Sequence, residues 1–224
     1  MKEQLRKNLD EVIWNIEQAR ILINEHHIVK LVAVGKYSDE ANIKTLYELG
    51  QRAFGENQVQ QLETRTKNLE ELPLEWHMMG NLQSNKINKL IELRPALFQS
   101  LDSLKLAEAL NKRLAEKNQK MSCLLQINAA NEASKSGVQA DEAFDLYQQI
   151  QESCPQLRLK GVMSIGAHVD DEKEIQKSFE ITHKIYDSLG KENATICSMG
   201  MSNDYELAIK CGSNLVRIGS KIFK

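Results

Sequence analysis

The amino-acid sequence predicts an α/β fold in which a single domain forms a (β/α)8 (TIM) barrel. Eight short apolar segments follow one another along the 224 residues. Most of them are separated by segments in which apolar residues recur at the three- to four-residue spacing of a helix. Strands that alternate with helices form a parallel sheet, and eight such units favour a closed barrel over an open sheet.

The predicted strands are the eight apolar segments, at residues 28–35, 52–56, 74–80, 96–101, 121–128, 157–166, 195–200 and 214–219. Helix patterns between them are clearest at residues 39–49, 102–118, 139–153 and 171–189. Residues typical of helix ends support these helices. Asp102 begins the second helix, while Gly50, Pro155 and Gly190 follow the ends of the first, third and fourth. No linker rich in Pro, Gly or Ser divides the chain, which supports one domain over residues 1–224.

A long amphipathic helix is predicted before the first strand. Over residues 3–24 the apolar side chains recur every three or four positions, beginning with Leu5, Leu9 and Val12. Only the segment SKIFK follows the last strand, and it is too short for a full eighth helix. We therefore expect an N-terminal helix within residues 1–26 to pack on the barrel where the eighth helix would otherwise lie.

Composition narrows the class of protein. The chain is 42% hydrophobic and 27% charged with a net charge of −2, so it has no basic field for nucleic acid. The N-terminal segment is too charged for a signal peptide, and no segment approaches the ~18 apolar residues of a membrane span. The four cysteines lack metal-ligand spacing. We expect a cytoplasmic protein without a metal, and a monomer because no strong apolar stripe is evident.

Polar residues gather after the predicted strands, at the end where (β/α)8 barrels place their active sites. Lys36 follows the first strand in VAVGK, and Asn57 follows the second in FGENQ. The third strand contains His77 and leads into GNLQSNK, while Arg217 lies within the last strand in NLVRIG. The carboxyl ends of parallel strands meet at one rim, so we expect these side chains to surround the mouth of the barrel.

A phosphate site is predicted at the same rim. Ser202 lies just before a short helix that ends at Gly212, and a hydroxyl beside free backbone N–H groups suits an anion. Gly219 lacks a side chain, so backbone amides can approach a ligand closely, and Ser220 follows it. Loops after the seventh and eighth strands commonly hold phosphate in such barrels. The sequence thus predicts a phosphate on one side of the mouth and the Lys36 amine across it.

Each of these residues also has a purely structural interpretation. A lysine at a strand end is more often solvated than reactive, a histidine in an apolar strand is more often a hydrogen-bonded core residue, and MGMS fits a plain helix cap. Arg217 is harder to explain in this way, since a buried arginine must be paired. The arrival of all these residues at one face of the barrel is what favours a ligand site.

The motifs along the chain resemble those of a known family. From about residue 30 to the end, VAVGK, FGENQVQ, WHMMGNLQSNK, QINAANEASKSG, GVMSIG, MGMSNDYELAI and VRIGSKIF are similar, in this order, to the YggS/PROSC family of pyridoxal 5′-phosphate homeostasis proteins. That family has a (β/α)8 barrel like the N-terminal domain of alanine racemase. The departures are small: Gly35 stands where many members have serine, Asn81 where histidine is frequent, and Ser220 where threonine is common.

The resemblance implies a role for each matching residue. Lys36 would form an aldimine with the C4′ aldehyde of pyridoxal 5′-phosphate, and we expect it to be partly buried at the mouth. Arg217 would face the pyridine nitrogen of the cofactor. The residues that would hold the phosphate are Ser202, Gly219 and Ser220, and those that would line the cofactor are Asn57 and Met79. The resemblance assigns no mechanism to His77, Gln83, Asn85, Lys86 and Lys135.

The function that the resemblance implies is binding of pyridoxal 5′-phosphate for its intracellular homeostasis, with supply of the cofactor to apo-enzymes. An arginine beside the pyridine nitrogen would leave that nitrogen unprotonated and the ring a weak electron sink. The 224 residues also contain no second domain that would supply an acid–base tyrosine. We therefore expect a binding protein and not an enzyme. Two rival functions stay open: a pyridoxal-phosphate racemase or decarboxylase of narrow range, and a cofactor-free aldolase that uses Lys36 on a sugar phosphate.

Overall fold

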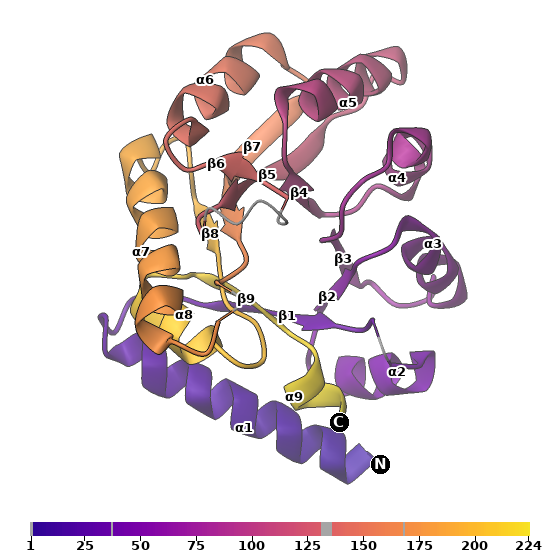
Figure 1. Cartoon of the computed structure of the whole chain (residues 1–224). Coiled ribbons are helices and arrows are strands. Elements are labelled where there is room, and N and C mark those ends of the chain that lie inside the picture. The colour runs from indigo at the N-terminus through magenta and orange to yellow at the C-terminus, as the bar shows by residue number, and fades with distance from the viewer. Residues whose placement is uncertain (1, 37, 131–135, 168) are drawn as a thin grey trace.

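The computed structural model describes residues 2–36, 38–130, 136–167 and 169–224. The main strands in this part of the chain are β1 (Lys30–Val34), β2 (Ala53–Glu56), β3 (Glu75–Met78), β4 (Leu97–Leu101), β5 (Met121–Asn128), β7 (Leu157–Ser164), β8 (Ile196–Ser198) and β9 (Leu215–Ile218). They are parallel and adjacent in the order β4-β3-β2-β1-β9-β8-β7-β5, and pairing of β4 with β5 closes the barrel (Figure 1). The predicted (β/α)8 barrel is confirmed.

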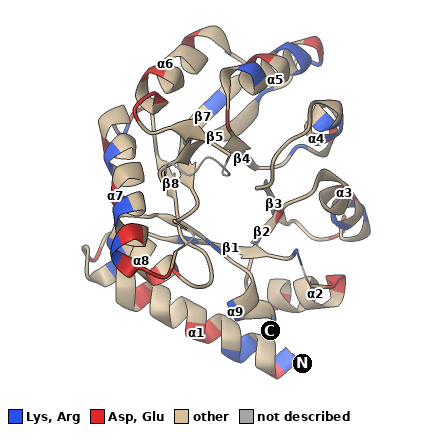
Figure 2. Ribbon diagram, viewed as in Figure 1, with Lys and Arg blue, Asp and Glu red and all other residues tan. Residues whose placement is uncertain are grey.

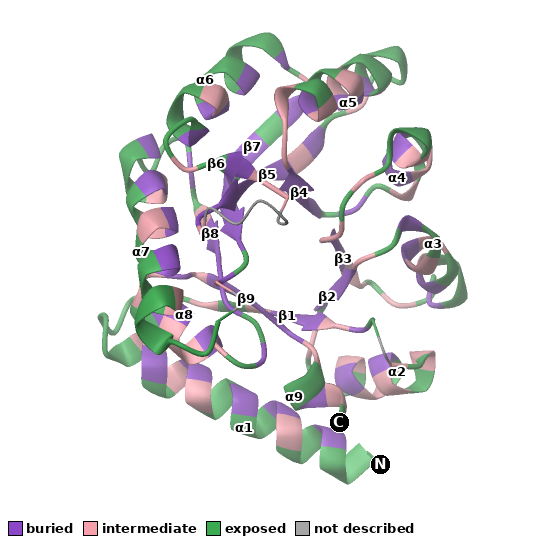
Figure 3. Ribbon diagram, in the orientation of Figure 1, coloured by how far each residue is buried: buried purple, intermediate pink, exposed green. Residues whose placement is uncertain are grey.

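Helices surround the barrel. They are α1 (Lys2–Ile21), α2 (Glu40–Glu48), α3 (Val59–Asn68), α4 (Ile87–Leu93), α5 (Leu104–Glu116), α6 (Ala143–Ser153), α7 (Glu172–Leu189), α8 (Tyr205–Lys210) and α9 (Ser220–Phe223), with a 3-10 turn, η1 (Ser84–Lys86), before α4. Charged residues lie mainly on these helices (Figure 2). The helices alternate between buried and exposed residues, while most strand residues are buried (Figure 3). This is the arrangement that the helical spacing of apolar residues predicts.

Two details differ from the sequence prediction. The short strand β6 (Val138–Gln139) pairs with the end of β5, so helix α6 begins at Ala143 and not at residue 139. Two residues are too few to show the alternation that identifies a strand, so the pattern of the following helix was extended over them. All of the main strands except β5 are also shorter than the apolar segments, and β1, β3, β7, β8 and β9 stop before their segments end, where the chain leaves the sheet at the rim of the barrel.

Helix α1 lies along α8 and α9 on the outside of the barrel, and both chain ends are on this side (Figure 1). Its inward face is buried and consists of Leu5, Leu9, Val12, Ile16 and Ala19. The side chain of Asn8 donates hydrogen bonds to the backbone carbonyls of Ile222, at 3.0 Å, and Lys224, at 2.8 Å. The helix therefore occupies the place where a full eighth helix would cover β9, and it also binds the short last helix.

The strands separate two apolar layers. On β1, Ala33 faces the helices and Val32 faces the barrel axis, as the two-residue period of a strand requires. The inner layer is small and consists of Val32, Ala53, Leu97, Leu124, Met163 and Leu215. Most of the core lies in the outer layer between strands and helices. Burial of these side chains stabilises the barrel and brings the strand ends together at one rim.

Within the described residues, no helix is long and apolar enough to cross a membrane. The same residues contain no group of three or more His, Cys, Asp or Glu side chains placed to hold a metal ion. The four cysteines, Cys123, Cys154, Cys197 and Cys211, are free thiols.

Candidate ligand site at the barrel mouth

The structure brings the predicted site residues to one rim. Strand β1 pairs with β2 on one side and with β9 on the other, so Lys36 follows a strand that lies between those of Asn57 and Arg217. Met79 follows β3, the next strand beyond β2. The side chain of Lys36 is exposed, and the expected partial burial was wrong. The reason is that Lys36 lies beyond the end of β1, in a turn outside the sheet.

The turn that carries Lys36 begins at Gly35. The backbone N–H of Gly35 still donates to the carbonyl of Gly55 on β2, at 3.2 Å, so Gly35 remains attached to the barrel. Its carbonyl accepts a hydrogen bond from the N–H of Ser38 at 2.8 Å, and Asp39 then caps helix α2. Lys36 is therefore held between a strand and a capped helix, at the point where the backbone changes direction.

A buried ion pair supports this turn from the outer layer. Glu56, the last residue of β2, is 0% exposed, and its carboxylate lies 2.8 Å from Nε of Arg65 on α3. Burial raises the pKa of Glu56 to about 7, although the charge of Arg65 acts to lower it. Sequence reasoning missed this pair, because Arg65 lies in a polar helix segment that looks solvent-exposed. The glutamate at the end of an otherwise apolar strand was the signal that could have pointed to it.

The predicted phosphate residues lie together. The hydroxyl of Ser202 accepts hydrogen bonds from the backbone N–H groups of Gly219, at 3.2 Å, and Lys221, at 3.5 Å. Ser220 begins helix α9 between them. Ser202 does not cap α8, as its position in the sequence suggested, because Asp204 occupies that position. The hydroxyl of Ser202 instead faces the start of α9.

Gly219 lies against the end of β1. A Cβ atom at this position would be 3.1 Å from the carbonyl oxygen of Val34. Only a residue without a side chain therefore fits here without displacing its neighbour. This close approach places the backbone N–H groups at the start of α9 next to the strand that leads to Lys36.

Arg217 is buried inside the barrel, with 5% of its surface exposed. Its guanidinium donates to the hydroxyl of Ser198 at 2.6 Å and to the carbonyl of Ser164 at 2.8 Å. Burial lowers the pKa of Arg217 to about 10, against the attraction of the more distant Asp204. Arg217 is paired, as expected for a buried arginine, through neutral oxygen atoms. It therefore keeps its charge at neutral pH.

His77 is a core residue of the barrel interior. Its Nδ1 atom lies 2.8 Å from the side-chain amide of Gln99, which accepts a hydrogen bond from Ser198 at 2.7 Å. Its Nε2 atom lies 2.8 Å from the carboxylate of Glu75. Burial lowers the pKa of His77, whereas its hydrogen bond with Glu75 lowers the pKa of that carboxylate to about 2. The structural interpretation of His77 is the correct one, and the network it belongs to ends at Arg217.

Gly55 and Gly80 leave room for Met79 and Asn57, respectively, at the rim. A Cβ atom at Gly55 would lie 2.3 Å from the terminal carbon of Met79, and one at Gly80 would lie 1.9 Å from the carbonyl oxygen of Asn57. The carbonyl of Met79 also accepts a hydrogen bond from Ser100 at 2.6 Å. Both predicted lining residues are half-buried at the rim, and Met79 packs against the inner apolar layer.

The remaining family-motif residues lie around the same rim. Gln83 and Asn85 are exposed, and Lys86 is half-buried at the end of η1. The side chain of Asn81 donates to the hydroxyl of Ser136 at 2.8 Å. Lys135 lies outside the described residues. The structure therefore gives Asn81 a contact, and it gives Lys86 no role beyond its place near the mouth.

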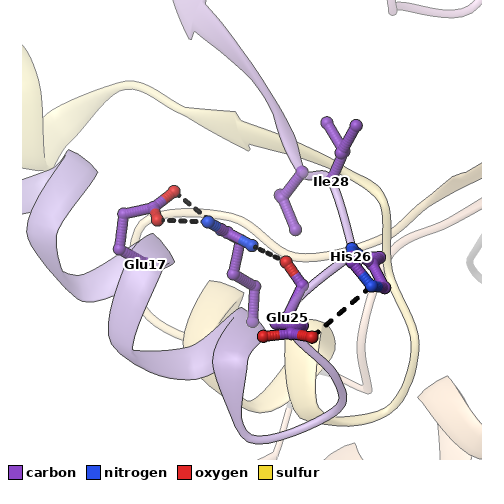
Figure 4. Close-up of a pocket in the computed structure, with 6 residues that line it drawn as sticks. Glu17, Glu25, His26 and Ile28 are labelled. Carbon is purple, nitrogen blue, oxygen red and sulfur yellow. Dashed lines mark hydrogen bonds and ion pairs between the residues drawn. The ribbon is translucent and has the colours of Figure 1, made fainter.

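A surface hollow lies at the opposite end of β1 (Figure 4). Its lining residues are Glu17, Arg20, Glu25, His26, Ile28 and Val29. The lining residues from Glu25 to Val29 lead into the start of β1, whereas Lys36 follows the end of that strand. Arg20 is already held in the hollow by the two carboxylate oxygens of Glu17 and by the carbonyl of Glu25. The hollow is thus separate from the site at the barrel mouth.

Comparison with known proteins defines the class of protein first. The alanine racemase N-terminal domain family matches residues 7–224, which is the class of barrel seen here. Two solved structures of PipY from Synechococcus elongatus are similar to this chain. The one without PLP is 29% identical with a TM-score of 0.87, and covers 98% of this chain and 100% of PipY. The one with PLP bound is 30% identical with a TM-score of 0.79, and the match covers 93% of this chain and 100% of PipY.

A curated relative is more similar in sequence. The pyridoxal phosphate homeostasis protein of Helicobacter pylori is 55% identical over 219 residues, which cover 98% of this chain and 98% of the relative. At this identity and coverage, the chain belongs to the family of pyridoxal phosphate homeostasis proteins.

Proposed function

We propose that this chain binds pyridoxal 5′-phosphate at the barrel mouth and serves the intracellular homeostasis of that cofactor. The observation that carries the proposal is the meeting, at one rim, of a lysine amine, a serine hydroxyl with backbone N–H groups, and a buried arginine. The family supports it, since the Helicobacter pylori relative is named for pyridoxal phosphate homeostasis and PipY has a structure with PLP bound.

The residues at the start of α9 fit a phosphate group. Backbone N–H groups of Gly219 and Lys221 both point toward Ser202 Oγ, so donors already converge on one oxygen position. Phosphate oxygens accept such hydrogen bonds well, and the start of a helix favours negative charge. The proposed phosphate ligands are Ser202, Gly219 and Ser220.

Lys36 is the proposed attachment point. When bound, the cofactor supplies an aldehyde carbon with which a primary amine condenses with loss of water. The exposed Lys36 follows β1, whose last residue, Val34, lies against Gly219, so Lys36 and the proposed phosphate ligands belong to neighbouring strand ends. Asn57 and Met79 follow the strands on the other side of β1, where they would line the cofactor.

The position and charge of Arg217 disfavour catalytic turnover of amino acids. Its guanidinium is fixed by Ser198 and by the carbonyl of Ser164, and it stays protonated at neutral pH. A charged donor facing the pyridine nitrogen would leave that nitrogen without a proton, which weakens carbanion stabilisation. This supports a binding protein over a racemase or decarboxylase, as does the name of the family.

The same proposal extends to partners and location. We propose that the bound cofactor is handed to apo-enzymes and that the chain acts as a monomer in the cytoplasm. Its free thiols, of which Cys123, Cys154 and Cys197 are buried, suit a reducing compartment.

Titration with pyridoxal 5′-phosphate tests the binding. The wild-type protein should bind the cofactor and keep its absorption band after desalting. Lys36→Ala should lose the band that survives desalting, while it binds part of the cofactor reversibly through the phosphate residues. The matched control is Lys105→Ala on the exposed face of α5, which should behave as wild type. If Lys36→Ala keeps the band after desalting, Lys36 is not the attachment point.

A second assay separates a carrier from an enzyme. Loaded wild-type protein should restore the activity of a pyridoxal-phosphate apo-enzyme and should not interconvert the enantiomers of alanine or serine. Interconversion by wild type that is lost in Lys36→Ala would establish the racemase instead. A protein that ignores pyridoxal 5′-phosphate altogether would favour a cofactor-free aldolase.

A further inference from the structure

The Glu56–Arg65 pair is attached to the backbone on both sides of Lys36. One terminal nitrogen of Arg65 donates to the carbonyl of Gly35 at 2.8 Å and to the carbonyl of Ser38 at 2.5 Å. The side chain of Arg65 is only 5% exposed, so these contacts lie beneath the turn. A single arginine thus joins the residue before Lys36 to a residue just after it.

Glu56 orients this arginine. Its carboxylate lies 2.8 Å from Nε of Arg65, and both side chains are almost fully buried. The hydrogen bonds of the terminal nitrogen to the carbonyls of Gly35 and Ser38 fix the direction of the planar guanidinium, and the Glu56 carboxylate adds electrostatic attraction at Nε. Since Glu56 ends β2, the turn is fixed with respect to the sheet itself.

Gly35 leaves room for the pair. A Cβ atom at this position would lie 2.9 Å from a carboxylate oxygen of Glu56 and 3.0 Å from a terminal nitrogen of Arg65. The backbone of Gly35 therefore packs directly on the side chains of Glu56 and Arg65. The three residues form one unit, in which the position of the backbone beside Lys36 depends on the arginine.

We propose that Arg65 is a positioning residue for Lys36, and that the buried Glu56–Arg65 pair sets the direction in which the Lys36 side chain leaves the rim. The inference rests on the proposed function, because it concerns covalent attachment at Lys36. In that step the Lys36 nitrogen bonds to the aldehyde carbon, and the aldehyde oxygen leaves as water with the two amine protons. A fixed turn presents the amine in one geometry, and rates of bond formation depend strongly on such geometry.

Arg65→Lys tests this proposal, because lysine keeps the charge but cannot replace the fork of donors. The rate of covalent attachment of pyridoxal 5′-phosphate is measured by stopped-flow absorption. Affinity for pyridoxine 5′-phosphate, which has an alcohol in place of the aldehyde, is measured by equilibrium titration. The rate should fall about tenfold or more, while the affinity for pyridoxine 5′-phosphate changes by less than about twofold.

A readout without ligand accompanies these measurements. Hydrogen exchange of the Ser38 amide, which donates to Gly35, should be about tenfold faster in Arg65→Lys. The control is Arg113→Lys, an exposed arginine on α5, and it should match wild type in every measurement. If Arg65→Lys does not fold, Gly35→Ala provides the second variant, since its added methyl group presses on the same pair.

Three results would overturn the proposal. Unchanged attachment and exchange rates in Arg65→Lys would show that Lys36 does not depend on this contact. If the attachment rate of pyridoxal 5′-phosphate and the affinity for pyridoxine 5′-phosphate fall by the same factor, Arg65 only stabilises the fold. Failure of wild type to take up either ligand would overturn the proposed function as well, which distinguishes that outcome from the other two.

Discussion

The buried carboxylate of Glu56 predicts an unusual dependence of stability on pH. Its pKa is raised from an ordinary value of 4.5 to about 7, chiefly by burial. Below pH 4.5, Glu56 carries a proton in both the folded and the unfolded chain. Between pH 4.5 and 7, the unfolded chain has released this proton and the folded chain retains it. Stability is therefore lost as pH rises, by about 1.4 kcal/mol for each pH unit or about 3 kcal/mol in all.

Glu56→Gln removes this dependence, because an amide resembles the protonated carboxyl and cannot ionise. Urea unfolding of both proteins, followed by tryptophan fluorescence from pH 5 to pH 8, measures the difference in free energy of unfolding. Subtracting one free energy of unfolding from the other at each pH cancels the contributions of the other titrating groups, which the two proteins share. The wild type should become less stable relative to Glu56→Gln as pH rises towards 7, and the difference should then be constant.

Glu63→Gln is the matched control, since Glu63 is on the nearby helix α3 and pairs with Lys89 at the surface. The free energy of unfolding of Glu63→Gln, plotted against pH from 5 to 8, should run parallel to that of wild type. The reasoning is refuted if wild type gains stability relative to Glu56→Gln as pH rises. That result would mean that attraction by Arg65 exceeds the cost of burial and holds the pKa of Glu56 below its ordinary value.

Two further substitutions test the packing of α1 and the phosphate site. Leu9→Ala removes a side chain that is 2% exposed and should lower the free energy of unfolding by about 3 kcal/mol, whereas Trp14→Ala, at a residue 64% exposed, should change it by about 0.5 kcal/mol or less. Equal losses in urea titrations of the two variants would contradict the packing of α1. Ser202→Ala should weaken binding of pyridoxal 5′-phosphate about tenfold in a fluorescence titration. Ser153→Ala at the end of α6 should not weaken it, and equal affinities would remove Ser202 from the site.

The sequence predicted the barrel well because each element has its own signal. Apolar segments and helical spacing alternate along the chain, and a parallel barrel is the arrangement that buries all of them. The rule that strand ends meet at one rim also brought Lys36, Ser202 and Arg217 together. Such a rule depends on the order of elements alone, so it needs no knowledge of side-chain contacts.

What the sequence did not reveal depends on contacts between distant elements. Arg65 in LETRTKN has the neighbours of a surface residue, and only the packing of α3 against β2 buries it beside Glu56. The contact of Ser202 with α9, in place of a cap on α8, likewise requires the loops after β8 and β9 to be adjacent. Exposure of Lys36 depends on the shape of one turn, which neighbouring residues do not determine.

The measurement that tests the central claim most directly is a map of the covalent attachment. Wild-type protein is mixed with one equivalent of pyridoxal 5′-phosphate, reduced with borohydride, digested and analysed by mass spectrometry. We predict one stoichiometric modification, on Lys36. A modification on Lys86 or Lys135, or one spread over several lysines at low yield, would contradict the assignment of Lys36 as the residue that holds the cofactor.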